Sequence, residues 1–228
     1  MKNESMNIDE WVMHYQQVGA QRIYLIDNCS TDDTVAKAKA WVDKGVVELI
    51  ERPVKHRQIQ HYWDAIETFK IRKTCRWLLI ADLDEFWFCP GGESLPVRLE
   101  AFGGIDVIYS NFRSFGSSGL INHPGSIRQN LIHCESKLDH HYHKKYLCRT
   151  SAIKSSKSID VHKVKNADSG KTVSDNHDLN LFHYTPSPTC LIPDVCIDER
   201  RLPLLIARAT LRDLIAGLEA RATGGAAR

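Results

Sequence analysis

The chain of 228 residues lacks several features that would assign it to a special class of protein. No stretch approaches the roughly 18 consecutive apolar residues that cross a bilayer, so the sequence predicts no transmembrane helix. The first ten residues, MKNESMNIDE, contain no apolar segment of the kind found in secretory signal peptides. We therefore expect a cytoplasmic protein, which could lie at the inner face of the membrane if its substrate is anchored there.

An excess of one charge and paired cysteine motifs are also lacking. Lys and Arg number 30 against 28 Asp and Glu, which argues against a dedicated nucleic-acid-binding protein. The seven cysteines are odd in number and form no C-x-x-C pair, so we expect reduced thiols rather than a disulfide framework. Residues 137–165 nevertheless carry eight Lys or Arg against two Asp, which suits a phosphate-bearing ligand or a solvated loop.

The first 90 residues alternate between helix and strand patterns. Apolar residues recur every three or four positions in 5–18 and in 58–72, which predicts helices. Short apolar runs at 22–27, 46–51 and 77–81 predict buried strands, and a polar turn after the first run begins another helix. This order is typical of an α/β fold with a mostly parallel central sheet flanked by helices.

The pattern changes after this region. Residues 106–111 predict a further strand, and 203–221 return to a helical period. We expect one domain over residues 1–190, followed by a helical tail at 191–228.

Two aspartates follow the strand predicted at 77–81 directly. Residues two apart in an extended segment point the same way, so Asp82 and Asp84 can face one cation. Magnesium and manganese are usually held by one or two carboxylates, with substrate phosphates completing the coordination shell. Ligands of parallel α/β sheets bind at the carboxyl ends of strands, where this turn and the polar turn at 27–33 both lie. The sequence therefore predicts a divalent metal ion, Mn²⁺ or Mg²⁺, and a nucleotide-diphosphate substrate.

Two other interpretations of this turn exist. Phosphatases of the haloacid dehalogenase type also place Asp-x-Asp after an apolar strand, and there the first Asp is the nucleophile. In that family the motif follows the first strand and precedes Thr or Val, whereas here it follows the third predicted strand and precedes Glu85. The remaining interpretation is a pair of solvated turn aspartates.

A series of short motifs over about four-fifths of the chain resembles glycosyltransferases of families 2 and 92. In chain order these are Asn3-Glu4, Glu10-Trp11-Val12, His14-Tyr15, Gly19, Asp27-Asn28-x-Ser30-x-Asp32, Gln60, Tyr62, Trp77, Asp82-Leu83-Asp84-Glu85-Phe86, Phe115-Gly-Ser-Ser-Gly119, Lys145 and His183-Tyr184. Each motif is weak alone, but their order and spacing are fairly specific. The resemblance implies a GT-A (Rossmann-like) fold and metal-dependent, inverting transfer of a sugar from a nucleotide-sugar donor, first of all a UDP-sugar, to a glycan or lipid-linked acceptor.

The resemblance also implies roles for individual residues. Residues 1–90 would form the nucleotide-sugar half and 91–190 the acceptor half. Asp82 and Asp84 would hold the metal, with His183 as third ligand and His162 as the competing histidine. The residues implied in donor binding are Asn3, Glu4, Asp27, Asn28, Asp32 and Lys145.

The catalytic base is less well marked. An inverting enzyme needs a carboxylate that takes the proton of the acceptor hydroxyl. We place Glu135 first because it lies downstream of the Gly-Ser-Ser-Gly loop, ahead of four other carboxylates. These are Asp106, Asp160, Asp175 and Asp178.

The N-terminus departs from the family pattern. Glycosyltransferases of this type have an apolar strand immediately before the segment that matches Asn3-Glu4, and here Met1 stands where that strand would end. We expect the first, central strand of the sheet to be missing. The alternative function is accordingly an inactive or truncated relative that acts at most as a binding module.

Overall fold

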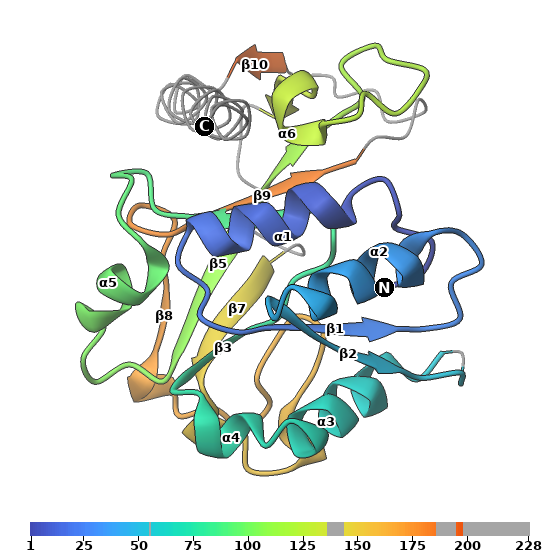
Figure 1. The fold of residues 1–228 in the computed structure, drawn as a ribbon. Coiled ribbons are helices and arrows are strands. Elements are labelled where there is room, and N and C mark those ends of the chain that lie inside the picture. Colours follow the sequence, from blue (N-terminus) through green and yellow to red (C-terminus); the bar gives the residue numbers. More distant parts are fainter. Residues whose placement is uncertain (55, 136–143, 186–194, 198–228) are drawn as a thin grey trace, which may run out of the picture. The chain divides into compact units, whose positions relative to one another are not determined.

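The computed structural model describes residues 1–54, 56–135, 144–185 and 195–197. The chain divides into two compact units, residues 1–196 and 197–228. The helix predicted at 203–221 lies outside the described residues and stays a prediction. Figure 1 shows the elements of the first unit in chain order.

The first elements alternate as the sequence predicts. They are α1 (Ile8–Gln17), β1 (Ile23–Asp27), α2 (Thr34–Asp43) and β2 (Val47–Glu51). β1 and β2 form a parallel two-stranded sheet in which Ile23 lies opposite Val47. α1 ends because Gly19 adopts a φ of +90°, a conformation that side-chain-bearing residues rarely adopt.

The single helix predicted at 58–72 is two helices, α3 (Gln58–Thr68) and α4 (Ile71–Thr74). Lys70 interrupts them with a left-handed conformation, φ 53°. This turn lets Phe69 stack on Tyr24 of β1, with ring centroids 4.8 Å apart, while Ile71 is buried next to it. Periodicity missed the break because the residues on both sides of it are apolar.

The remaining strands form one mixed sheet around β5. The strands are β3 (Trp77–Leu79), β4 (Glu85–Phe88), β5 (Val107–Phe115), β6 (His133–Glu135), β7 (Lys144–Arg149), β8 (Thr172–Ser174), β9 (Asn180–Tyr184) and β10 (Val195–Ile197). β5 runs antiparallel to β6 and β7 but parallel to β8 and β9. β3 is antiparallel to β7, and β4 is antiparallel to β9. The expected mostly parallel sheet is therefore right for β1 and β2 and wrong for most pairs of the larger sheet.

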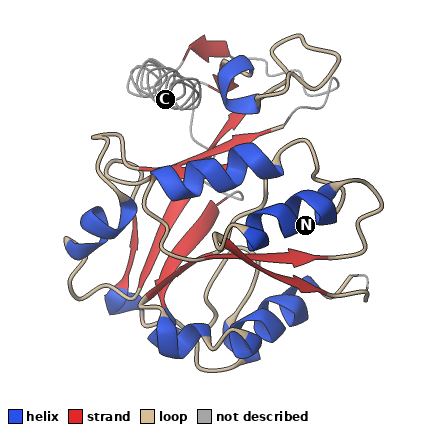
Figure 2. Cartoon of the chain, in the orientation of Figure 1, coloured by secondary structure: helices blue, strands red, loops and turns tan. Residues whose placement is uncertain are grey.

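The short helices lie in the connections. They are α5 (Leu95–Glu100) and α6 (Ile127–Asn130), with 3₁₀ turns at Thr150–Ala152, Ser156–Ser158 and Ser169–Lys171. Figure 2 shows helices, in blue, on both sides of the strands, in red. No described helix combines the length and the apolar character that crossing a membrane requires. No disulfide joins any two of Cys29, Cys75, Cys89, Cys134 and Cys148.

The two faces of β1 belong to different parts of the core. Ile23 and Leu25 pack in the cluster that contains the apolar face of α1, whereas Tyr24, on the opposite face, packs with Ile66 of α3. Among the described residues, β1 pairs only with β2, and β3 pairs only with β7. The other edges of β1 and β3 are therefore not joined by a ladder in the described part of the chain.

Candidate functional site

The acidic turn between β3 and β4 is held by its backbone. The Trp11 indole N–H donates to the carbonyl oxygen of Asp82 at 2.9 Å, and the Tyr184 N–H donates to that of Asp84 at 2.9 Å. The side chain of Leu83, between them, is buried in the core. As a result the Asp82 and Asp84 side chains are directed away from the core, 48% and 34% exposed.

Three side chains converge beside this turn. Glu85 begins β4 and lies directly opposite His183 of β9. One ligand atom each from Asp84, Glu85 and His183 lies within 4.8 Å of the others, and His183 Nε2 is 3.4 Å from Asp84 Oδ2. Asp84 Oδ1 is buried and has no hydrogen-bond partner among the described residues. Carboxylate oxygens with one imidazole suit a divalent ion such as Mn²⁺, so the donor set fits the predicted metal.

Asp82 has a different partner. The ammonium group of Lys145, on β7, lies 2.8 Å from Asp82 Oδ2 and 3.4 Å from Glu85 Oε1, and the lysine is completely buried. Lys145 was expected in donor binding, but here its ammonium group lies against two carboxyl groups of the protein. The structure thus groups Asp84 with His183 and ties Asp82 to Lys145.

Negative charge accumulates at this site. Burial raises the pKa of Glu85 to about 8, with the Asp82 charge acting in the same direction and Lys145 against it. Burial also raises the pKa of Glu4, and the charge of Asp84 adds to this effect. Burial acts to lower the pKa of His183, but the hydrogen bond to Asp84 and the charges of the neighbouring carboxylates together outweigh it, so the pKa is raised. A bound cation would relieve this repulsion between carboxylates.

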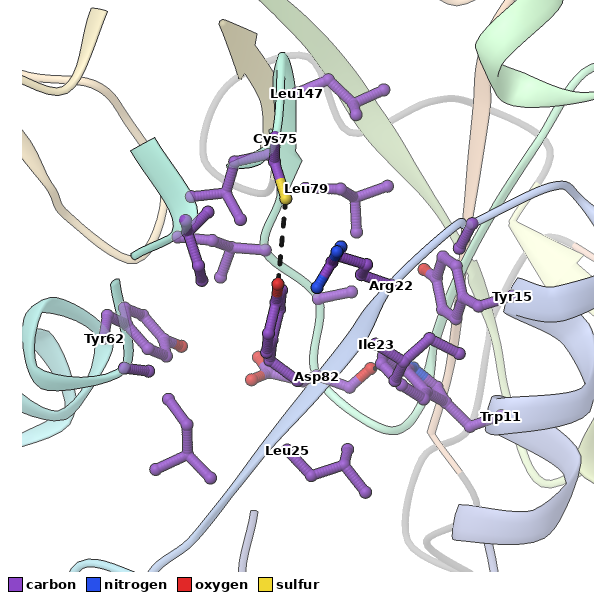
Figure 3. A pocket seen from close by; sticks show the side chains of 18 of the residues that line it. Trp11, Tyr15, Arg22, Ile23, Leu25, Tyr62, Cys75, Leu79, Asp82 and Leu147 are labelled. Carbon is purple, nitrogen blue, oxygen red and sulfur yellow. Dashed lines mark hydrogen bonds between the residues drawn. The ribbon is translucent and has the colours of Figure 1, made fainter. Parts of the chain in front are cut away.

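The turn borders a pocket of about 1000 Å³. Its polar end contains Glu4, Asn28, Asp82, Asp84 and His183. The rest is mainly apolar, and Figure 3 shows side chains from β1, β3 and α3 around it, with Asp82 in the middle of the view. The pocket therefore joins a carboxylate-rich end to an apolar interior.

Four of the predicted donor-binding residues have hydrogen-bond partners within the protein. The Asp27 carboxylate accepts from the hydroxyl and the N–H of Ser30, and the Asn28 amide donates to two carbonyl oxygens at 2.7 and 2.9 Å. Asp32 accepts from Thr34, which lowers its pKa to about 2.

Asn3, in the N-terminal segment, contacts the loop that follows β1. Its side-chain oxygen accepts from the Thr31 N–H at 2.8 Å. The polar side chains of Asn3, Asp27, Asn28 and Asp32 are thus engaged by other groups of the protein. Of the five donor-binding residues expected in the first 32 positions, Glu4 and Asn28 line the pocket.

Glu135, the expected base, lies at the end of β6. Cys134 lies opposite Phe115 of β5, and Phe115 lies opposite Tyr184 of β9. The neighbouring row of residues across these three strands therefore contains Glu135, Ser114 and His183. Strands lie about 4.8 Å apart, which places Glu135 two strands, or roughly 10 Å, across the sheet from His183. His162, the competing histidine, is exposed and contacts the carbonyl oxygen of Lys144 instead.

Sequence reasoning missed the role of Glu85. It belongs both to the Asp84–His183 group and to the Lys145 ion pair. The apolar run after it, residues 86–88, could have indicated a strand that carries Glu85 as its first buried side chain.

Comparison with known proteins gives one family. The family model Glycosyltransferase family 92 matches residues 2–188. A glycosyltransferase family 92 protein of Ricinus communis is 28% identical over 137 residues, covering 54% of this chain and 23% of the relative. A second, of Oryza sativa subsp. japonica, is 24% identical over 127 residues, covering 54% and 22%. The chain thus spans about a quarter of the length of these relatives.

Solved structures show a more distant likeness. The crystal structure of S. aureus TarS has a TM-score of 0.45 at 12% identity, covering 81% of this chain and 35% of TarS. TarS 1–349 in complex with UDP has a TM-score of 0.42 at 14% identity, covering 78% and 58%.

Proposed function

Starting from the fact that the chain belongs to glycosyltransferase family 92, we propose that it binds a nucleotide-sugar donor, first of all a UDP-sugar, in the pocket beside the acidic turn and transfers the sugar to a glycan or lipid-linked acceptor. The observation that carries this proposal is the group of Asp84, Glu85 and His183 with a buried, unpartnered Asp84 oxygen. A GT-A type of fold is part of the proposal. It is supported by the order of β1, α2 and β2 and by the acidic turn after β3.

Asp84 and His183 would hold a divalent metal ion, with Asp82 beside them. When bound, such an ion supplies charge neutralisation for the departing diphosphate. The Lys145 ammonium group holds the Asp82 carboxylate, and the Trp11 indole N–H holds the Asp82 carbonyl oxygen. These contacts pre-organise the carboxylates, so their alignment costs little when the donor binds.

The donor nucleoside would contact Glu4 and Asn28, because both line the polar end of the same pocket. Glu135 would take the proton from the acceptor hydroxyl in an inverting reaction. Its row on the sheet, two strands from His183, supports this role, since an acceptor would enter between the donor and the base.

Isothermal titration calorimetry of UDP with and without Mn²⁺ tests the donor site. We expect metal-dependent binding by the wild type and at least tenfold weaker binding by Asp84→Asn, which corresponds to about 1.4 kcal/mol. Asp43→Asn, an exposed aspartate at the end of α2, is the matched control and should bind as the wild type does.

Equal binding without metal, or an unchanged affinity in Asp84→Asn, would refute the metal-assisted donor site. A folded wild type that binds no UDP under either condition would favour the inactive relative. Hydrolysis of UDP-sugars by the wild type, and its loss in Glu135→Gln with UDP affinity retained, would then separate the base from the donor site.

A further inference from the structure

Two segments that are distant in the sequence form one basic surface. They are residues 69–76, around α4, and residues 150–165, which follow β7. The Thr150 N–H donates to the Arg76 carbonyl oxygen at 3.0 Å, and the Thr150 hydroxyl donates to the Cys75 carbonyl oxygen at 2.6 Å. Figure 1 shows the second segment, in gold, beside α3 and α4, in teal. The two segments therefore lie side by side.

The second segment is anchored by its apolar side chains. Ile153, Ile159 and Val164 are at most 5% exposed and belong to the core cluster that contains the apolar residues of α3 and α4. Ile159 and Val164 also form an isolated β-bridge. The Lys154 N–H donates to the Ser158 hydroxyl oxygen at 3.3 Å, which fixes the turn between the anchors. The polar side chains of this segment are thus presented on a well-defined backbone.

Six cations of the two segments have no acidic partner. Among the described residues none of the six forms an ion pair, whereas Arg72 pairs with Glu67 and Lys165 with Asp160. Asp160 is also the only acidic residue in either segment. The six, called the basic row below, are all exposed: Lys70, Lys73, Arg76, Lys154, Lys157 and Lys163. Like charges held close together repel each other, and a bound polyanion would remove this repulsion.

One end of the basic row lies close to the acidic turn. His162 Nδ1 donates to the Lys144 carbonyl oxygen at 3.0 Å, and the next residue of β7, Lys145, contacts Asp82. Lys163 follows His162 directly in the chain. The row therefore extends from the polar end of the pocket to α4, which suits a ligand that is a long chain rather than a single anion.

The surroundings of the row argue against a nucleic acid. Residues 150–165 contain no Phe, Trp or Tyr on which bases could stack, and Phe69 of the other segment is already stacked on Tyr24. α4 has four residues and the neighbouring 3₁₀ turns have three, so none of them is long enough to read the major groove of a duplex.

They also argue against a membrane surface. The exposed large apolar side chains of the described residues all lie outside the two segments. Segments that lie in a membrane interface insert such side chains among the lipids. Here the exposed residues between the cations include Ser151 and Ser155. Serine hydroxyls suit the hydroxyl groups of a sugar, and lysine ammonium groups suit phosphates.

We propose that the basic row binds a linear glycan that carries phosphate groups, and that this glycan is the acceptor of the transferred sugar. Its phosphates lie against the lysines, and its chain continues toward the acidic turn. The inference rests on the proposed function for the transfer step, because it names the class of acceptor. Binding of the glycan itself requires no donor.

The transfer step balances with the groups already named. An acceptor hydroxyl oxygen bonds to the anomeric carbon of the donor sugar while the bond from that carbon to the diphosphate oxygen breaks. The nucleoside diphosphate leaves with the electron pair of this bond, and Glu135 takes the hydroxyl proton. The basic row takes no part in these bonds; it holds the acceptor chain.

Fluorescence anisotropy with labelled phosphomannan tests the surface, with phosphate-free mannan as the ligand control. We expect the wild type to bind only phosphomannan. Lys154→Ala/Lys157→Ala should weaken this binding roughly fivefold or more, and so should Lys70→Asn/Lys73→Ala from the other segment. Asparagine is chosen because it tolerates the left-handed conformation of Lys70. In each pair, the slope of log affinity against log salt concentration should fall by about two.

A control variant and two other anions complete the experiment. Lys39→Ala/Lys44→Ala removes the same charge from the exposed side of α2 and should bind phosphomannan as the wild type does. Vesicles of phosphatidylglycerol with phosphatidylcholine, and duplex DNA, should bind more weakly than phosphomannan. Phosphomannan, but not mannan, should also increase the release of UDP from UDP-glucose, UDP-galactose or UDP-N-acetylglucosamine.

Four results would overturn the proposal. The first is equal binding of the two mannans, and the second is an unchanged affinity for phosphomannan in either pair of the basic row. The third is tighter binding of the vesicles or of DNA that is lost in the same pairs, which would assign the row to a membrane or to nucleic acid. The fourth is UDP release that phosphomannan does not increase in a protein that binds UDP, which would remove the acceptor role. Phosphomannan binding without any UDP binding would instead refute the donor site and leave the basic row as a glycan-binding surface.

Discussion

At the scale of single residues, one buried cation organises the site. Lys145 is completely buried and serves both Asp82 and Glu85. A buried carboxylate without a partner is strongly disfavoured, because water no longer solvates its charge. The lysine thus keeps Asp82 in place while Asp84 and His183 stay accessible from the pocket.

Replacing this lysine should destabilise the fold. Lys145→Met leaves the buried Glu85 carboxyl group next to Asp82 without a cation, and we expect a loss of about 3 kcal/mol in the free energy of unfolding. Urea unfolding measures it, with the exposed Lys154→Met as control. The double variant Lys145→Met/Glu85→Leu should recover part of the loss, because it removes one of the unpaired charges. A double variant less stable than Lys145→Met would contradict this account.

At the scale of elements, α1 positions most of the site. Its side chains contact two segments. Trp11 donates to the acidic turn, and Tyr15 and His14 contact the carbonyl oxygens of Glu85 and Trp87 in β4, at 3.1 and 2.8 Å. Glu10, from the same helix, holds the segment before α6. Helical spacing explains this arrangement, since one ten-residue helix presents side chains both to β4 and to the segment before α6.

The contact of Glu10 with the α6 segment is the testable part. Its carboxylate accepts hydrogen bonds from the Ser126 hydroxyl, the Ile127 N–H and the Arg128 guanidinium, at 2.8 to 3.0 Å. Glu10→Ala should cost roughly 3 kcal/mol, because charged hydrogen bonds are lost and Arg128 is left without this partner. The Ile127 amide should lose protection in hydrogen exchange. Glu100→Ala, at the exposed end of α5, should leave both quantities unchanged.

At the scale of the whole molecule, stability depends on a histidine that must stay neutral. His14 is buried, its Nδ1 faces Arg128 at 2.7 Å, and its Nε2 faces the Trp87 carbonyl oxygen. Burial, followed by the charge of Arg128, lowers its pKa to about 3, while the Trp87 hydrogen bond acts against this. In the unfolded chain the pKa of a histidine is about 6.5.

The consequence is a defined pH dependence. Between about pH 6.5 and pH 3 the unfolded state binds the proton that the folded state rejects, so the free energy of unfolding falls as pH falls. From pH 7 to pH 5 the wild type should lose up to roughly 2 kcal/mol more than His14→Gln, which cannot titrate. Urea unfolding at several pH values measures the difference. Parallel curves for the two proteins would show that His14 takes up its proton equally well in both states.

Much of the first unit followed from local patterns in the sequence. The apolar spacing of residues 5–18 predicted α1, and the short apolar runs predicted β1, β2 and β3 within one or two residues. The turn carrying Asp82 and Asp84 was also placed correctly at the end of a strand. Each of these features depends on residues that are neighbours in the chain, so period and spacing are sufficient to indicate them.

The tertiary structure decided strand direction and the partners of the carboxylates. A buried apolar run has the same pattern in either direction, so the antiparallel pairing of β3 with β7 could not be predicted from it. Lys145 lies 63 positions from Asp82, and His183 lies almost 100 from Glu85, to which it is joined only by the β4–β9 register. The sequence alone determined most of the elements up to β3 and where the acidic turn lies. Contacts between distant segments decided which charges share a site, because desolvation and pairing energies arise only when those segments pack together.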